Sequence, residues 1–269
     1  MTDPILTVKD LSKTFGAFTA VDGVTFELAA GSSIGIVGES GSGKTTVARM
    51  IIGLEQPSAG AITCCGNDRS HPSRATGARR ARAREAQMVF QDPYTSLDPH
   101  QTIHQTLAEA VRLHETNSAT TYSERVQALA DMVSLDARLL ASMPGHLSGG
   151  QRQRVAIARA LAADPRVLVL DEAVAALDVS IQAQILNLLA DIRDATGLAY
   201  VFITHDLAVV RQVTEHSIVM QKGRIVESGR TADLLRNPKH PYTRALLDSV
   251  PRPGWTPARR AVPVVEPVA

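Results

Sequence analysis

The chain has 269 residues and a formal net charge of +1, with 44% apolar and 20% charged residues. This composition is ordinary for a soluble globular protein, and the balanced charge gives no overall field that would attract nucleic acid or an anionic surface. The longest apolar runs, at 167–170 and 199–203, fall far short of the ~20 residues that a membrane-spanning helix needs. The first residues do not resemble a signal peptide. We therefore expect any membrane role to come from a partner.

The two cysteines, Cys64 and Cys65, are adjacent in the sequence. Neighbours this close rarely form a disulfide, and two thiols alone make no zinc site. We expect two half-buried strand residues in a reducing compartment. The eight histidines have no metal-ligand spacing, so no transition-metal site is expected.

Alternating apolar and polar residues predict strands near the start of the chain. The segments 5–11 and 24–28 alternate in this way, which indicates an antiparallel sheet with one solvated face. Denser apolar runs, typical of buried parallel strands, occur at 33–38, 166–172 and 198–206. Helical patterns lie between them, at 44–54, 152–163 and 180–195. We predict an α/β fold with a mainly parallel central sheet and an N-terminal antiparallel β-subdomain.

The middle and the end of the chain follow other patterns. Residues 92–150 contain two amphipathic helical patterns with no strand between them, which predicts an inserted helical subdomain. Residues 217–229 are typical of a hairpin that turns at Lys222 and Gly223. Residues 1–250 are expected to form one domain. The proline-rich tail, 251–269, is expected to be disordered.

Six arginines lie between residues 69 and 84: Arg69, Arg74, Arg79, Arg80, Arg82 and Arg84. A solvated helix face or loop is the first interpretation of such a run. Contact with acidic lipid or with an acidic partner surface remains an alternative. No aromatic residues interleave with the charges, which disfavours nucleic-acid binding.

The segment "GESGSGKTT" follows a predicted strand, precedes a predicted helix and fits the pattern of a phosphate-binding loop. Its glycines allow the backbone to wrap around phosphates, Lys44 supplies positive charge to the β- and γ-phosphates, and the Thr45 hydroxyl can bind Mg²⁺. The nucleotide-binding residues predicted here are Gly38, Glu39, Ser40, Gly41, Ser42, Gly43, Lys44, Thr45 and Thr46. The fold class then becomes a P-loop NTPase core, with ATP and Mg²⁺ as cofactors.

Two acidic residues and a histidine end the later predicted strands. Asp171 closes an apolar strand and is placed to bind Mg²⁺, while Glu172 is available as a general base for an attacking water. His205 ends another strand and could reach a γ-phosphate. A helix cap for the acidic pair and a structural role for the histidine are the alternatives without the phosphate loop.

The segment "LSGGQ", residues 147–151, is a second glycine-rich stretch. Ser148 and Gln151 fit a capping box that would merely start a helix. Capping does not explain Gly149 and Gly150, each of which lowers helix stability by roughly 1 kcal/mol relative to alanine. Two glycines in a first turn expose amides, and a helix N-terminus binds anions. We predict that this loop meets the ATP of a partner chain in a head-to-tail pair.

These motifs resemble the nucleotide-binding subunit of ATP-binding cassette (ABC) transporters over residues 5–250, with "LSGGQ" as the family's signature sequence. The resemblance implies that Phe15 stacks on adenine and that Gln91 touches Mg²⁺ and the attacking water and links to the transmembrane partner. It also implies that Glu172 is the catalytic base, that His205 is a switch residue, and that Asp178 belongs to a loop crossing the dimer interface.

Finer features resemble the peptide and nickel importers, above all "NPKHPYTRALLDSVP" near the end. The resemblance implies a second, different ATPase subunit, two transmembrane permease subunits and an extracytoplasmic substrate-binding protein. It places the chain peripherally at the cytoplasmic face of the plasma membrane. Oligopeptide or dipeptide import is the first reading. A nickel or other small-solute importer and a soluble non-transport ABC ATPase are the alternatives.

Three departures from the family pattern matter. Ala173 and Ala175 stand where proline and serine are usual, which leaves the interface loop in question. The tail holds no cysteine, so no iron–sulfur cluster is expected. The substrate is not readable, because in such systems other chains contact it.

Overall fold

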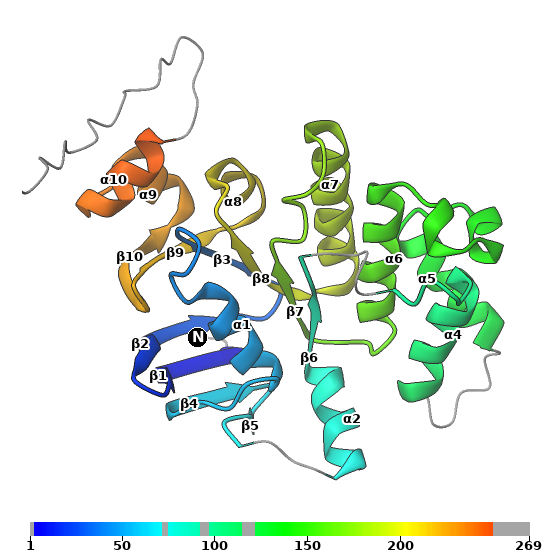
Figure 1. Ribbon diagram of the computed structural model, residues 1–269, viewed down its shortest axis with the longest axis horizontal. Coiled ribbons are helices and arrows are strands. Elements are labelled where there is room, and N and C mark those ends of the chain that lie inside the picture. Colours follow the sequence, from blue (N-terminus) through cyan, green and yellow to red (C-terminus); the bar gives the residue numbers. More distant parts are fainter. Residues whose placement is uncertain (1–2, 72–74, 92–96, 115–121, 250–269) are drawn as a thin grey trace, which may run out of the picture.

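The computed structural model describes residues 3–71, 75–91, 97–114 and 122–249. Two sheets and a separate group of helices build this part of the chain (Figure 1). Arg74 of the arginine run and the whole tail, 251–269, lie outside the described residues.

The first sheet is four-stranded and antiparallel, in the order β2-β1-β4-β5. Its strands are β1 (Leu6–Phe15), β2 (Phe18–Leu28), β4 (Ala59–Cys64) and β5 (Asn67–Asp68). In β1 the side chains of Leu6, Val8 and Leu11 are buried while Lys9 is exposed, so the sheet has one solvated face. The predicted antiparallel pair is confirmed.

The second sheet has six strands in the order β10-β9-β3-β8-β7-β6. Its strands are β3 (Ser33–Val37), β6 (Ala86–Val89), β7 (Val167–Asp171), β8 (Ala199–Thr204), β9 (His216–Gln221) and β10 (Arg224–Arg230). The first five run parallel, and β10 returns antiparallel through a turn at Lys222 and Gly223, both with positive φ. The mainly parallel sheet and the hairpin are confirmed, and every residue of β3, β7 and β8 is buried, as their apolar runs predict.

Helices cover the parallel sheet on both faces. Outside the group between β6 and β7, the helices are α1 (Lys44–Ile52), α2 (Thr76–Glu85), α7 (Val179–Thr196), α8 (Leu207–Val213), α9 (Thr231–Arg236) and α10 (Pro241–Asp248). Helix α2 comes just before β6, and the others come after strands of this sheet. One apolar cluster joins α1 and the antiparallel sheet to β3, and another joins α7 to the helical group described next. The phosphate loop therefore emerges where the two sheets meet.

Between β6 and β7, the regular elements of the described residues are all helices. They are α4 (Ile103–His114), α5 (Tyr122–Met132), two 3₁₀ turns (Ala137–Ala141 and Pro144–His146) and then α6 (Gly149–Leu161). In the view of Figure 1 these helices gather at one end of the molecule, while α9 and α10 lie at the other end beside β10. Among the described residues, no helix has both the length and the apolar content that crossing a membrane would require.

Two expectations need correction. Cys64 is fully buried at the end of β4, but Cys65 lies in the following turn with a φ of 52°, so the two are not equivalent strand residues. Both thiols are free, with their sulfur atoms 3.9 Å apart. Arg69 is not solvated: it is 2% exposed, and its guanidinium donates to the Glu85 carboxylate at 2.7 Å. This partner neutralises the buried charge, which the run of arginines does not reveal.

Candidate functional site

The phosphate loop connects the buried strand β3 to helix α1. Gly38 and Gly43 are required for its close packing, because an added Cβ would lie 2.3 Å from the Met220 carbonyl oxygen and 2.5 Å from that of Ala20, respectively. Gly43 also has a φ of 102°, in the region that favours glycine. No side chain caps the start of α1, so the amides of its first turn are free to bind an anion.

Lys44, the first residue of α1, points back into this loop. Its Nζ lies 2.8 Å from the carbonyl oxygens of both Gly38 and Glu39. Burial lowers the pKa of Lys44, against the opposing effect of the carboxylates of Glu172 and Asp171. The Lys44 side chain is thus buried beside two loop carbonyl oxygens, a position where an ammonium group suits an anionic phosphate.

Two oxygen-bearing side chains, those of Asp171 and Thr45, lie together at the foot of the loop. Asp171 ends β7 and is buried, and the Thr45 hydroxyl donates to its Oδ1 at 3.2 Å. Burial raises the pKa of Asp171, while the Thr45 hydrogen bond and Lys44 favour the charged form. A hydroxyl and a carboxylate this close suit a small, hard cation, so the residues present fit Mg²⁺.

Glu172 is held between two side chains from other elements. The Gln91 amide donates to its Oε2 at 3.0 Å, and Nδ1 of His205 lies 3.2 Å from its Oε1. Gln91 follows β6 and His205 follows β8, so the edge of the parallel sheet brings three remote residues together. Glu172 has a φ of 47°, and its backbone N–H donates to the carbonyl oxygen of Ile203 at 2.8 Å. Strained conformations of this kind concentrate at functional sites.

A cavity of about 700 Å³ unites the loop with these side chains. It is lined by Phe15, Phe18, Ala20, Glu39, Ser40, Gly41, Gly43, Lys44, Thr45, Thr46, Gln91, Glu172, His205, Leu246 and Ser249. Phe15 is 47% exposed and Phe18 is 62% exposed, and the two are paired across the β1–β2 turn. Phe18, Ala20, Leu246 and Ser249 were not predicted from the sequence. For Phe18 the "FGAF" hairpin was a usable signal, and for Leu246 and Ser249 there was none.

The second glycine-rich stretch lies outside this cavity. Ser148 caps α6: its Oγ accepts from the Gln151 amide at 3.3 Å, and the Gln151 side chain accepts from the Ser148 amide at 2.8 Å. An added Cβ on Gly150 would lie 2.4 Å from Cγ2 of Ile181 in α7, so this glycine also serves the packing of two helices. On Gly149 the nearest atom would be 3.4 Å away, and no packing constraint accounts for this glycine.

Asp178 caps α7 and likewise does not line the cavity. Its Oδ1 accepts from the Ile181 amide at 3.0 Å and from the Ser180 hydroxyl at 2.8 Å, and these hydrogen bonds lower its pKa. The structure thus brings together Phe15, the phosphate loop, Gln91, Glu172 and His205, with Asp171 bound to Thr45. It leaves 148–151 and Asp178 on other surfaces.

Fold and cavity together define a P-loop nucleotide-binding protein. A family model described as "ABC transporter" matches residues 21–175, and one described as "Oligopeptide/dipeptide transporter, C-terminal region" matches 226–266. The first match spans more than half of the chain, which therefore belongs to the ABC transporter family. The resemblance drawn from the sequence, down to its peptide-transporter subgroup, is confirmed.

Known proteins of this kind align over most of the chain. The oligopeptide transport ATP-binding protein OppD of Mycobacterium bovis is 45% identical over 93% of this chain and 40% of its own length. The di/tripeptide transport ATP-binding protein DppF of Pseudomonas aeruginosa is 44% identical over 93% of this chain and 80% of its own. A dimeric ATP-binding cassette solved in a post-hydrolysis state, bound to ADP and Pi, superposes with a TM-score of 0.74 at 28% identity, covering 84% of this chain and 98% of that one.

Proposed function

We propose that the chain is the ATP-hydrolysing subunit of an ABC importer for oligopeptides or dipeptides. The observation that carries this proposal is the Glu172 carboxylate, held between Gln91 and His205 in the cavity that the phosphate loop lines. The names of the peptide-transport relatives support the substrate class. A nickel or other small-solute importer remains the second candidate.

In this proposal the chain hydrolyses ATP to ADP and phosphate. The free amides at the start of α1 and the Lys44 ammonium bind the phosphates, and Phe15 stacks on the adenine. Thr45 and Asp171 would hold Mg²⁺, which supplies positive charge to the phosphate oxygens when bound. Glu172 accepts the proton of the attacking water, while Gln91 and His205 orient its carboxylate.

The second glycine-rich stretch serves another chain in this proposal. Gly149 has no packing role, and it opens a helix, α6, whose amides at the N-terminus favour an anion. We place residues 148–151 and Asp178 at the interface with a second ATPase subunit, against the nucleotide held by that subunit's phosphate loop. The dimeric arrangement of the ADP-bound relative supports this reading. The peptide-importer resemblance favours a partner that is a different chain.

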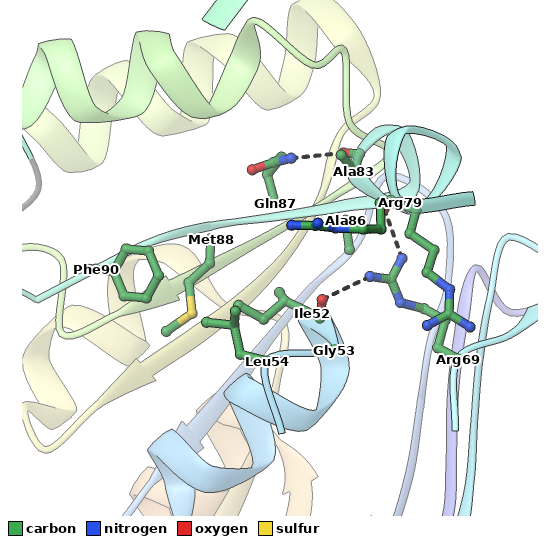
Figure 2. A pocket seen from close by; sticks show the side chains of 11 residues that line it. Ile52, Gly53, Leu54, Arg69, Arg79, Ala83, Ala86, Gln87, Met88 and Phe90 are labelled. Carbon is green, nitrogen blue, oxygen red and sulfur yellow. Dashed lines mark hydrogen bonds between the residues drawn. The ribbon is translucent and has the colours of Figure 1, made fainter. Parts of the chain in front are cut away.

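A groove beside α1 is the candidate contact for the permease. It measures about 380 Å³, and Figure 2 shows Met88 of β6 between Phe90 and Leu54, with Arg79 and Arg69 on the opposite side of the view. Leu54 is 61% exposed and Phe90 is 37% exposed. Phe90 directly precedes Gln91, which donates to Glu172. A segment bound in this groove would therefore contact the residue next to Gln91. Attachment there would hold the chain at the cytoplasmic face of the plasma membrane.

The decisive experiment is reconstitution. The chain is co-expressed with its permease and second ATPase candidates, purified and placed in vesicles with the binding protein. We expect ATP-dependent uptake of labelled peptide, whereas uptake of nickel without peptide would favour the second candidate. The chain alone should be mostly monomeric and a slow ATPase. A stable ATP-dependent dimer of this chain with full activity would contradict the second, different ATPase subunit.

A further inference from the structure

Helix α10 reaches the nucleotide cavity from a part of the chain that contains none of the nucleotide-binding motifs. Leu246 and, just after the helix, Ser249 line the cavity together with Phe15 and Phe18. The Tyr242 hydroxyl accepts a hydrogen bond of 3.0 Å from the backbone N–H of Glu39, in the phosphate loop. The C-terminal helix therefore contacts both the loop and the space that the nucleotide would occupy.

The contact with Glu39 fixes the loop from outside. The Glu39 N–H is bound by Tyr242, and its carbonyl oxygen is bound by Lys44 at 2.8 Å. Burial raises the pKa of Tyr242 and thus favours the neutral phenol, whose oxygen accepts from the Glu39 N–H. A glycine-rich loop has many accessible conformations, and each fixed amide lowers the entropy lost when a ligand orders it.

The start of α10 is itself firmly anchored. The Glu227 carboxylate on β10 accepts from the backbone N–H groups of Lys239 at 2.8 Å and His240 at 3.0 Å. The His240 ring caps the helix, since its Nδ1 accepts from the Tyr242 amide at 3.2 Å. Tyr242 is thus presented to the loop by a fixed backbone.

The other end of α10 packs against the sheet. Leu246 and Leu247 both contact the apolar cluster formed by Val37, Leu207 and Val210, and Val37 is the last residue before the phosphate loop. Only Leu246 of these two leucines also lines the cavity. The cavity's other apolar side chains, Phe15, Phe18 and Ala20, are suited to a base rather than to phosphates, and Leu246 shares that chemistry.

We propose that α10 is part of the nucleotide site, with Tyr242 as a positioning residue for the phosphate loop and Leu246 as apolar surface for the base. This inference rests on the proposed binding of ATP. It makes the C-terminal segment a determinant of nucleotide affinity.

The test separates the two contacts with two ligands. The full chain carries Glu172→Gln so that ATP is not consumed, and calorimetry measures its affinity for Mg-ATP and for Mg-tripolyphosphate, which lacks base and ribose. Tyr242→Phe should weaken both ligands about three- to tenfold, the range expected for one lost hydrogen bond. Leu246→Ala should weaken ATP by a similar factor and leave tripolyphosphate within about twofold.

Two matched variants control for stability. Tyr200→Phe removes a tyrosine hydroxyl that donates to the Leu189 carbonyl at 2.8 Å, away from the cavity. Leu247→Ala removes the other leucine of the same apolar cluster. Both should lower the Tm and leave both affinities unchanged within about twofold.

The outcomes are distinct. Unchanged affinities in Tyr242→Phe overturn the positioning role. A loss in Leu246→Ala that is equal for both ligands, or that Leu247→Ala reproduces, overturns the contact with the base. If the parent chain bound neither ligand, the proposed function would fall and this inference with it, whereas a binding parent with unaltered variants overturns the inference alone.

Discussion

The phosphate loop, residues 38–46, and the second glycine-rich stretch, residues 148–151, differ in how much of their surroundings the chain itself supplies. Around residues 38–46 a charged lysine, two carboxylates, a glutamine and a histidine converge on one cavity. Around residues 148–151 a capping box closes the helix end, and none of these four residues lines the cavity. The first region is built to bind by itself, and the second needs a surface from elsewhere. The difference is a reason to expect two chains at each nucleotide.

The largest effect should come from the first region. In the reconstituted complex, Glu172→Gln should slow ATP hydrolysis by about 10²–10⁴-fold, because the water loses its general base. The affinity for ATP should stay within about twofold, since Lys44 and the loop are untouched. Steady-state phosphate release and calorimetry measure the two quantities. Turnover near the unmodified rate would remove Glu172 as the base.

Lys44→Ala should act on binding instead. It removes a buried ammonium that lies 2.8 Å from two loop carbonyls, and charge-assisted hydrogen bonds contribute about 1.5–3 kcal/mol each. We expect the affinity for Mg-ATP to fall by about ten- to a hundredfold. Lys9→Ala, at an exposed position of β1, makes the same charge change away from the cavity and should have no effect. If Lys44→Ala and Lys9→Ala bound Mg-ATP with equal affinity, Lys44 would not contribute to phosphate binding.

The second region can be tested by separating its two glycines. Gly150→Ala should destabilise the isolated chain by about 1–3 kcal/mol, because the new Cβ would meet Ile181 at 2.4 Å. Gly149→Ala should leave the Tm near its original value, since the nearest atom would be 3.4 Å away at the end of a leucine side chain. Thermal unfolding of both variants measures this difference.

Gly149→Ala, which should hardly change stability, should nevertheless change activity. In the two-subunit complex, Gly149→Ala should impair hydrolysis of the nucleotide on the partner's phosphate loop, while the isolated chain keeps its own affinity for ATP. Ser148→Ala provides a second probe at the same helix end. If Gly149→Ala leaves the complex fully active, then residues 148–151 only start a helix and do not contact the partner's nucleotide.

Local patterns predicted the parts that depend on local chemistry. The buried strands and the helix starts follow from periodicity, glycines and caps, so β3, α1, β7 and α6 could be located in advance. The convergence of Gln91, Glu172 and His205 depends on the strand order of the sheet, which no local pattern predicts. Glu172 and His205 were predicted from their places at strand ends, and Gln91 only from the family resemblance. The bond between Tyr242 and Glu39 joins residues 203 positions apart and has no local signal. Arg69 was misjudged because its buried partner, Glu85, lies on a different element.

The smallest effect concerns the aromatic side of the first region. Phe15→Ala should weaken Mg-ATP binding near the lower end of the ~1–3 kcal/mol typical of base stacking, because the ring is 47% exposed. Lys13 Nζ already lies 4.8 Å from the ring centroid, so one face is partly occupied. Mg-tripolyphosphate binding should not change, since it carries no base. Phe18→Ala is the matched control across the hairpin, and a larger loss there would assign the stacking to Phe18. A large drop in Tm for Phe15→Ala with unaltered affinity would instead make Phe15 a packing residue.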